Sequence, residues 1–207
     1  DAYGYSKFAR VTLATNNIDF RSRVSSKEEL DFLASVPTNA TYKDIDNADH
    51  VVLINFEPED ESPIVFLRIY KQVHKRSVRV TTIAALASRG TQKLKANLIK
   101  TAAGNEVAAV NSISGLTGKS VVLVGERAAE TEGALSAVAK LVKESGAKLG
   151  WVPRRAGERG AIAAGALPNL LPGARPIEDA SARVDIATAW SVDSVPTTAG
   201  MSTEEII

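Results

Sequence analysis

The stretch that decides the fold is residues 120–152, SVVLVGERAAETEGALSAVAKLVKESGAKLGWV. It opens with a short apolar run at residues 120–124, which is typical of a strand buried on both faces of a sheet. Apolar residues then recur at helical spacing, and Gly146 predicts the end of that helix. Residues 147–152 form a second strand-like run. A strand–helix–strand unit of this kind implies a right-handed crossover, so the sequence predicts an α/β fold with a mainly parallel sheet.

The same alternation precedes this unit along the chain. Residues 51–54, Val-Val-Leu-Ile, predict a buried strand, and residues 78–83 predict the next one. Between them lie an acidic loop at residues 55–63 and a helix that Pro63 can begin. We expect this helix to place three apolar residues on one side: Ile64, Leu67 and Val73.

Helical patterns also open the chain. A first helix is predicted by four apolar residues: Tyr3, Phe8, Val11 and Leu13. Ser26 and Glu29 have the spacing of a capping box, which predicts a second helix after Ser26. The chain begins with Asp1 rather than Met, and residues 203–207 resemble the opening of another helix. We therefore expect the chain to be an internal fragment of a longer polypeptide.

Small and polar residues at 112–119, SISGLTGK, indicate a boundary between two similar halves. We expect two Rossmann-like lobes with mainly parallel sheets, residues 1–113 and 114–207. Ligands in parallel sheets bind beyond the carboxyl ends of the strands. Three loops are expected at that position: residues 55–62, 84–91 and 153–160.

Composition excludes several classes of site. The net charge of +1 over 207 residues gives no support for nucleic-acid binding, and no apolar run is long enough for direct membrane insertion. The absence of cysteine excludes disulfides, iron–sulfur ligation and cysteine–zinc sites within these residues. His50 and His74 have no second histidine at ligand spacing, so we expect them to be solvated or to lie at a helix end.

An arginine-rich segment follows the last predicted strand. Residues 151–175 read WVPRRAGERGAIAAGALPNLLPGAR and contain Arg154, Arg155 and Arg159 among several glycines. Guanidinium groups bind phosphate and carboxylate through paired hydrogen bonds, and glycine lets backbone N–H groups approach an anion. The segment therefore indicates an anion or nucleotide site, or the remains of one. A glycine-punctuated loop whose arginines bond to backbone carbonyls fits the residue types equally well.

Stretches spread through nearly the whole chain resemble a known family. These are DAYGYSKFARVTLATNNIDFR, NADHVVLINFEPEDESPIVFLR, ASRGTQKLKANLIKTAAGNE, VGERAAETEGALSAVAKL, WVPRRAGERGAIAAGALPNLLPG and ARVDIATAWSVDSVP. In this order they resemble the G subunits of bacterial NADH-quinone oxidoreductase, respiratory complex I, whose mammalian counterpart is the 75-kDa iron–sulfur subunit. The wider resemblance is to molybdopterin oxidoreductases, such as formate dehydrogenases and nitrate reductases.

The nucleotide-binding loops of that wider family are altered here. Where the family has Gly-Ser-Asn-Pro after a strand, this chain has Asn55-Phe56-Glu57-Pro58, followed by further carboxylates. Like charges near a phosphate are unfavourable, and a side chain blocks close backbone approach. The family's second contact, Asp-Pro-Arg, has no equivalent in residues 81–84. A third stretch keeps its Gly-Ala end at Gly160, but arginines and a glycine replace its asparagines.

The resemblance therefore implies a retained fold with lost cofactor chemistry. We expect no cofactor in these residues, and a vestigial site whose candidate residues are Asn55, Glu57, Arg154, Arg155, Arg159 and Gly160. The iron–sulfur clusters are expected in the preceding, cysteine-rich region of the parent subunit. The expected partners are other hydrophilic-arm subunits, on the cytoplasmic side of the inner membrane. Two alternatives remain open: a catalytic molybdopterin-binding fragment, and a nucleotide- or anion-binding module.

Overall fold

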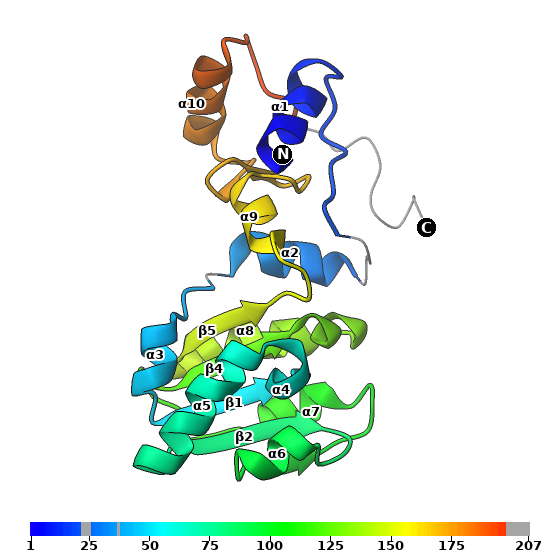
Figure 1. Cartoon of the computed structure of the whole chain (residues 1–207). Coiled ribbons are helices and arrows are strands. Elements are labelled where there is room, and N and C mark those ends of the chain that lie inside the picture. The colour runs from blue at the N-terminus through cyan, green and yellow to red at the C-terminus, as the bar shows by residue number, and fades with distance from the viewer. Residues whose placement is uncertain (22–25, 37, 198–207) are drawn as a thin grey trace. The chain divides into compact units, whose positions relative to one another are not determined.

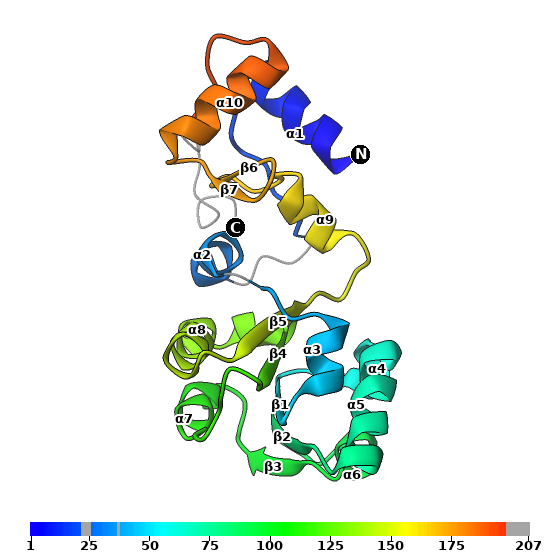
Figure 2. The same ribbon diagram turned by 90° about the vertical axis from the view of Figure 1, so that its left-hand side faces the viewer.

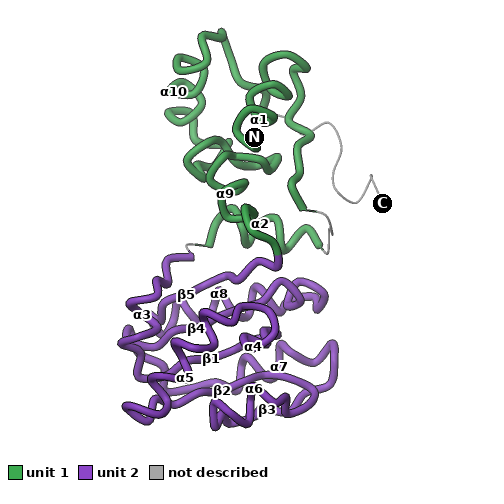
Figure 3. Tube along the Cα trace, viewed as in Figure 1, with its two compact units in different colours: residues 1–36, 155–207 green, residues 37–154 purple. Residues whose placement is uncertain are grey.

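The computed structural model describes residues 1–21, 26–36 and 38–197 (Figure 1). It divides into two compact units: unit 1 comprises residues 1–36 and 155–207, and unit 2 comprises residues 37–154 (Figure 3). Residues 203–207, where the sequence predicts the opening of a helix, lie outside the described residues. Each unit is described by itself below.

Unit 2 is an α/β domain, as the sequence predicts. Its helices and strands, in chain order, are α3 (Tyr42–Asn47), β1 (His50–Ile54), α4 (Pro58–Glu61), α5 (Pro63–Arg76), β2 (Arg79–Ala84), α6 (Arg89–Lys93), β3 (Asn97–Lys100), α7 (Glu106–Asn111), β4 (Val121–Gly125), the 3-10 helix η1 (Glu126–Glu130), α8 (Ala134–Ser145) and β5 (Lys148–Val152). The five strands form one sheet in the order β3-β2-β1-β4-β5, and every neighbouring pair is parallel.

Helices cover both faces of this sheet. Figure 2 shows α3, α4 and α5 on one face and α7 and α8 on the other. On the first face, Ile69 and Val73 of α5 pack in one core with Leu53 of β1 and Leu123 of β4. The central strands β1 and β4 are buried along their whole length. This burial on both faces explains why their sequences are continuous apolar runs.

The predicted lobe boundary differs from the division in the structure. β1 and β4 pair in parallel, with Val51 opposite Val121, so strands from both predicted lobes belong to one sheet. The small, polar residues at 112–119 lie in the crossover between β3 and β4, inside unit 2. The prediction failed because a turn-rich segment looks the same in the sequence at a domain boundary and in a crossover between two strands of one sheet.

The expected apolar side of α5 is also corrected. Ile64 and Leu67 are exposed, whereas the buried apolar side chains of α5 are Val65, Phe66, Ile69 and Val73. The buried set follows the helical spacing of i, i+4 and i+8, which Ile64, Leu67 and Val73 do not share. The start of the helix at Pro63 is confirmed.

Unit 1 is built from both ends of the chain. Its elements are α1 (Ala2–Val11), α2 (Lys27–Ser35), α9 (Glu158–Ala163), the short antiparallel pair β6 (Leu170–Leu171) and β7 (Arg175–Pro176), and α10 (Ala180–Trp190). The predicted cap of α2 is present, because the Ser26 side chain accepts a hydrogen bond from the Glu29 backbone N–H. Its core packs residues of α10 around Leu171 and Ile177.

Candidate functional site

A cavity of about 470 Å³ opens at the carboxyl edge of the sheet in unit 2. The chain runs outward from β1 to β2 and β3, then crosses back to β4 and β5, so the strand order reverses between β1 and β4. Ligands of open α/β sheets bind in the crevice at this reversal. The cavity is lined by the end of β2 and by residues that follow β1, β2, β3 and β4: Asn55, Phe56, Glu57, Asp60, Thr82, Ile83, Ala84, Ala85, Leu86, Ser88, Thr101, Ala103, Glu106, Arg127 and Glu130.

Asn55 stands at the end of β1 with a positive φ of 48°. Asparagine tolerates this left-handed conformation better than most residues. Its side-chain amide donates a hydrogen bond of 3.3 Å to the Glu106 carboxylate. The same carboxylate accepts a hydrogen bond of 2.8 Å from the Thr131 hydroxyl. The asparagine that stands in place of a glycine therefore bonds to the protein itself.

Glu106 is the buried acid of this cavity, with 6% of its surface exposed. Burial by itself raises the pKa of its carboxyl group. The hydrogen bonds from Thr131, from the backbone and from Asn55 act in the opposite direction, and their sum holds the pKa of Glu106 below its ordinary value. The carboxylate is thus ionised and satisfied by groups of the chain.

Gly125 at the end of β4 serves the close approach of two strand ends. A Cβ atom at this position would lie 2.4 Å from the Asn55 carbonyl oxygen and 3.3 Å from the Phe56 Cα atom. Neither backbone atom can move without disturbing β1, so only glycine fits. Gly125 therefore makes room for the end of β1 and is not needed to make room for a ligand.

The acidic loop after β1 folds back on itself. Its Pro58–Glu61 segment forms the short helix α4, which Glu57 caps by accepting a hydrogen bond from the Glu59 backbone N–H. The Glu61 carboxylate accepts a hydrogen bond of 2.8 Å from the Glu57 N–H and forms an ion pair of 2.5 Å with Arg127. The sequence analysis predicted only an acidic loop here. It missed that these residues form a helical turn capped by its own carboxylates.

Two further contacts hold the loop against α6. Glu59 pairs with Lys93 of α6. A Cβ atom on Gly90 would meet the Glu57 carboxylate oxygen, so the bare backbone of this glycine lets the Glu57 side chain lie against the helix. Carboxylates that are neighbours in the sequence therefore each contact a different partner in the structure.

The cavity has an acidic lining. Among its described lining residues, four carry carboxylates, Glu57, Asp60, Glu106 and Glu130, and one carries a cation, Arg127. That cation is already paired with Glu61. A phosphate entering the cavity would face a surplus of negative charge, and Coulomb repulsion at such distances is costly near a protein surface.

The arginine candidates are placed elsewhere. Arg154, Arg155, Arg159 and Gly160 do not line the cavity, and all four are exposed. Arg155 lies 3.9 Å from Glu158, with 59% of its side chain exposed, so this ion pair contributes little. Helix α9 begins at Glu158, after Gly157 with φ 96°. Gly160 therefore lies inside this helix.

A site residue that the sequence analysis missed is Arg10, which is 2% exposed. Its guanidinium donates hydrogen bonds of 2.8, 3.0 and 2.7 Å to the carbonyls of Gly165, Leu167 and Leu170. It also bonds to the side chains of Asn16 and Ser6. Burial lowers the pKa of Arg10 to about 10, so the group is still charged at neutral pH.

The loop that Arg10 holds begins with residues 165–168, Gly-Ala-Leu-Pro, which belong to the arginine-rich segment 151–175 described above. Ser6 donates a hydrogen bond of 3.1 Å to the same Gly165 carbonyl, and the Asn16 amide donates to the Pro168 carbonyl. The carbonyls of this loop therefore face helix α1 and its following turn. A buried arginine has no signature in the sequence, because its partners lie about 155–160 residues away.

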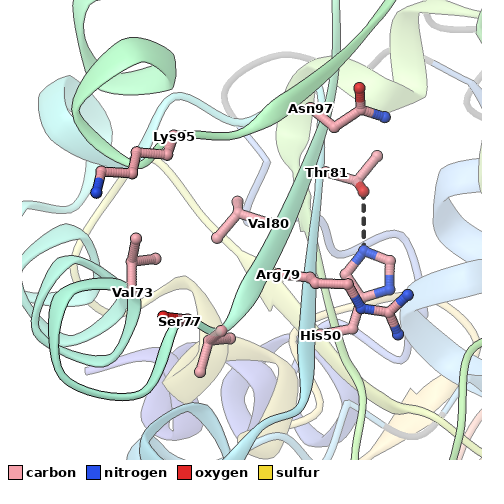
Figure 4. A pocket seen from close by; sticks show the side chains of 9 residues that line it. His50, Val73, Ser77, Arg79, Val80, Thr81, Lys95 and Asn97 are labelled. Atoms are coloured by element: carbon pink, nitrogen blue, oxygen red, sulfur yellow. Dashed lines mark hydrogen bonds between the residues drawn. The ribbon is translucent and has the colours of Figure 1, made fainter.

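A second cavity, of about 430 Å³, lies at the amino-terminal end of β2 (Figure 4). His50 of β1 lines it and is buried, not solvated as the sequence predicted. Its Nε2 atom forms a hydrogen bond of 2.8 Å with the Thr81 hydroxyl, while its Nδ1 atom has no partner among the described residues. Burial lowers the pKa of His50, and the charge of Arg79 lowers it further, against the opposite effect of Asp49.

The polar groups of this second cavity do not converge. In Figure 4 the Lys95 ammonium lies on the opposite side of β2 from His50 and Arg79. The cavity also adjoins Ser77, just after the last turn of α5, whose unpaired carbonyl groups repel anions. The carboxyl edge thus remains the candidate site.

Two further features concern membranes and metals. Among the described residues, no helix combines the length and the apolar character needed to cross a lipid bilayer. Within residues 1–21, 26–36 and 38–197, no three histidine, cysteine or acidic side chains are grouped so as to hold a metal ion.

Comparisons with known proteins agree with the fold. The chain is 49% identical over 218 residues to the NADH-quinone oxidoreductase G subunits of Mycobacterium bovis and of Mycobacterium tuberculosis, which covers 100% of this chain and 27% of each relative. It is 40% identical over 240 residues to the corresponding G subunit of Streptomyces coelicolor, with 100% and 28% covered. The chain thus spans about a quarter of the length of these curated relatives. Residues 1–166 match the molybdopterin oxidoreductase family, and the chain belongs to that family.

Proposed function

We propose that this chain is a structural domain of the G subunit of an NADH-quinone oxidoreductase. In this role it supports electron transfer from NADH to quinone without binding a redox cofactor itself. The proposal extends the printed names of the relatives to a chain that spans 27% of their length. The main observation behind the proposal is the cavity at the carboxyl edge. There the side chains bond to one another, at the positions where the wider family is expected to bind a nucleotide.

The cavity does not fit the nucleotide of a pterin cofactor. A phosphate there would have to compete with carboxylates for its donors, because a terminal nitrogen of Arg127 is paired with Glu61 and the Asn55 amide is bonded to Glu106. It would also need a glycine after β1, where the Asn55 side chain stands. Replacing the Asn55 contact would take one donor from the buried Glu106 carboxylate, which costs about 1–3 kcal/mol.

The rest of the proposal concerns the parent complex. Iron–sulfur clusters would be held by another region of the subunit, and the partners would be other subunits of the hydrophilic arm. The complete assembly would place this domain on the cytoplasmic side of the inner membrane, as a peripheral part.

Two other functions make different predictions. A catalytic molybdopterin-binding fragment requires that the cavity at the carboxyl edge bind the cofactor's nucleotide. An anion-binding module requires Arg154, Arg155 and Arg159 to bind a phosphate. These arginines are exposed, and Arg155 forms only a long, solvated pair with Glu158.

Direct binding separates these functions. Calorimetric titration with GDP and with inorganic phosphate at low ionic strength should show no saturable binding up to millimolar concentration. Saturable GDP binding with micromolar Kd would overturn the proposal if it is lost in Thr101→Trp, which places a bulky side chain in the cavity. Phosphate binding that is lost in Arg155→Ala would instead support the anion module.

Activity of the assembled complex gives a second test. Thr101→Ala and Asp60→Asn change groups that line the cavity and do not enter the sheet core. We expect NADH-quinone turnover per assembled complex to stay within about twofold of the parent. Val122→Asp, which puts a charge at a fully buried position of β4, should instead reduce the amount of assembled complex. A tenfold loss of turnover in a normally assembled Thr101→Ala complex would contradict the proposal.

A further inference from the structure

Helix α1 has its polar face inside and its apolar face outside. Ser6 is fully buried and Arg10 is 2% exposed, whereas Tyr5 is 71% exposed and Phe8 is 51% exposed. At 100° per residue, Tyr5 and Phe8 share one side of the helix with Val11, and Ser6 and Arg10 share the other. Surface helices normally have the reverse arrangement.

The apolar face continues beyond the helix. Leu13, two residues after α1, is 58% exposed, and Val11 is 38% exposed. Gly4 and Thr12, which also lie on this side, are exposed and carry no charge, and the charged residue on this side is the N-cap Asp1, one turn before Tyr5. We define the α1 apolar face as five residues: Tyr5, Phe8, Val11, Thr12 and Leu13. Exposed apolar side chains grouped in this way on one helix and the residues after it form a candidate interaction surface.

Helix α1 cannot turn this face inward. The Arg10 guanidinium is anchored to carbonyls of Gly165, Leu167 and Leu170, and Ser6 bonds to the first of them. Rotating the helix would break these buried hydrogen bonds and expose a set of unsatisfied carbonyls. The outward direction of Tyr5 and Phe8 is therefore fixed by the interior contacts.

We propose that the α1 apolar face docks against the part of the same polypeptide that lies outside residues 1–207. The curated relatives support this, since the chain spans only 27% of their length. The small size of the face supports it too. A stable interface between separate proteins takes about 20–30 residues on each side, because association costs translational and rotational freedom. A covalently connected segment does not bear that cost in full, so five residues suffice.

Other occupants fit less well. Helices that lie on membranes carry lysine and arginine on an exposed polar face beside the apolar one. In α1 the polar face is buried, and Arg10 is bonded to protein carbonyls. A second copy of the chain would have to bind through this small face alone. The inference is independent of whether the carboxyl edge binds a cofactor.

Photocrosslinking in the full-length polypeptide tests the proposal. Phe8→p-benzoylphenylalanine places the probe on the α1 apolar face, and Lys143→p-benzoylphenylalanine on α8 is the matched control, since Lys143 is exposed and helical. After irradiation of the assembled complex, we expect intrachain products that join the peptide containing residue 8 to a peptide outside residues 1–207. Their yield should exceed that of the control at least fivefold.

Each other outcome overturns the proposal. Products that join residue 8 mainly to another subunit, to a second copy or to lipid would assign the face to that partner. A yield equal to the Lys143 control would mean that the face is solvated. Because Phe8 is exposed, the aromatic probe should not disturb folding, and a Phe8→Tyr variant with unchanged assembly checks this.

Discussion

At the scale of single residues, Arg10 makes an extensive set of buried hydrogen bonds in unit 1. Five donor–acceptor contacts connect its guanidinium to carbonyls and side chains from both ends of the chain. Lysine cannot reproduce this set, because a guanidinium directs its donors in a fixed planar fork. The fold of unit 1 therefore depends on one side chain whose importance the sequence does not reveal.

Arg10→Met should lower the free energy of unfolding of unit 1 by about 2–5 kcal/mol, because several buried carbonyls lose their donors. Urea denaturation followed by fluorescence measures the loss. Arg79→Met is the control, since Arg79 is exposed, and it should change the midpoint little. Equal stability of Arg10→Met and the parent would show that Arg10 does not stabilise the unit.

Glu106 should make the stability of unit 2 depend on pH in the acidic range. Its pKa is depressed in the folded state, so its stabilisation is complete above the unfolded value of about 4.3 and is lost as the pH falls through the lower folded value. Glu106→Gln removes this contribution. We expect the stability difference between parent and variant to be largest above about pH 5 and to narrow as the pH falls below 4.

Glu144→Gln provides the comparison for that experiment. Its carboxylate is 66% exposed and pairs only weakly with Lys140 at 4.0 Å. Its stability curve between pH 3 and pH 7 should run parallel to that of the parent. A difference between the parent and Glu106→Gln that stays constant across the same range would disprove the role of ionised Glu106.

At the scale of elements, strands with continuous apolar runs are predictable from the sequence, and the short edge strand β3 is not. The apolar runs at 51–54 and 120–124 predicted β1 and β4 to within a residue, because a strand covered on both sides is mostly apolar. β3, Asn97–Lys100, escaped the analysis. It lies at the sheet edge and is only partly buried, so Leu98 and Ile99 are its sole apolar residues.

The candidate site was predictable in its position and not in its contacts. Asn55 and Glu57 were expected at the carboxyl edge from their place after a strand, and both line the cavity there. The bond from Asn55 to Glu106 joins residues 51 positions apart, which no local pattern encodes. The role of the arginine candidates stays a prediction.

Gly125→Ala tests the close approach of β1 and β4. The new Cβ atom would overlap the Asn55 carbonyl oxygen, so we expect a loss of about 1–3 kcal/mol in the stability of unit 2. Gly118→Ala is the matched control, because its nearest neighbour would be 3.8 Å away. Comparable unfolding midpoints for the two variants would mean that the strand ends can separate without cost.

At the scale of the whole molecule, each unit contains one tryptophan. Trp151 belongs to β5 of unit 2, and Trp190 belongs to α10 of unit 1. The two cores are separate sets of residues. The boundary predicted at 113–114 missed this division, because a sequence shows where turns occur but not which distant strands will pair.

Two single-tryptophan variants should therefore report two transitions. With Trp151→Phe, the Trp190 signal follows unit 1, and with Trp190→Phe, the Trp151 signal follows unit 2. We expect different urea midpoints, and Arg10→Met should shift the Trp190 curve alone. Coincident curves that shift together in Arg10→Met would show that the chain unfolds as one cooperative body.

The division of unit 1 between the two ends of the chain has a consequence for biosynthesis. Arg10 leaves the ribosome long before the carbonyl of Gly165, which is 155 residues further along. At about 5–20 residues per second, the interval is roughly 10–30 s. Unit 2 lies wholly within that interval and can fold first. During this interval, the nascent helix α1 exposes its unpaired arginine on one side and its aromatic rings on the other. We therefore expect it to bind chaperones.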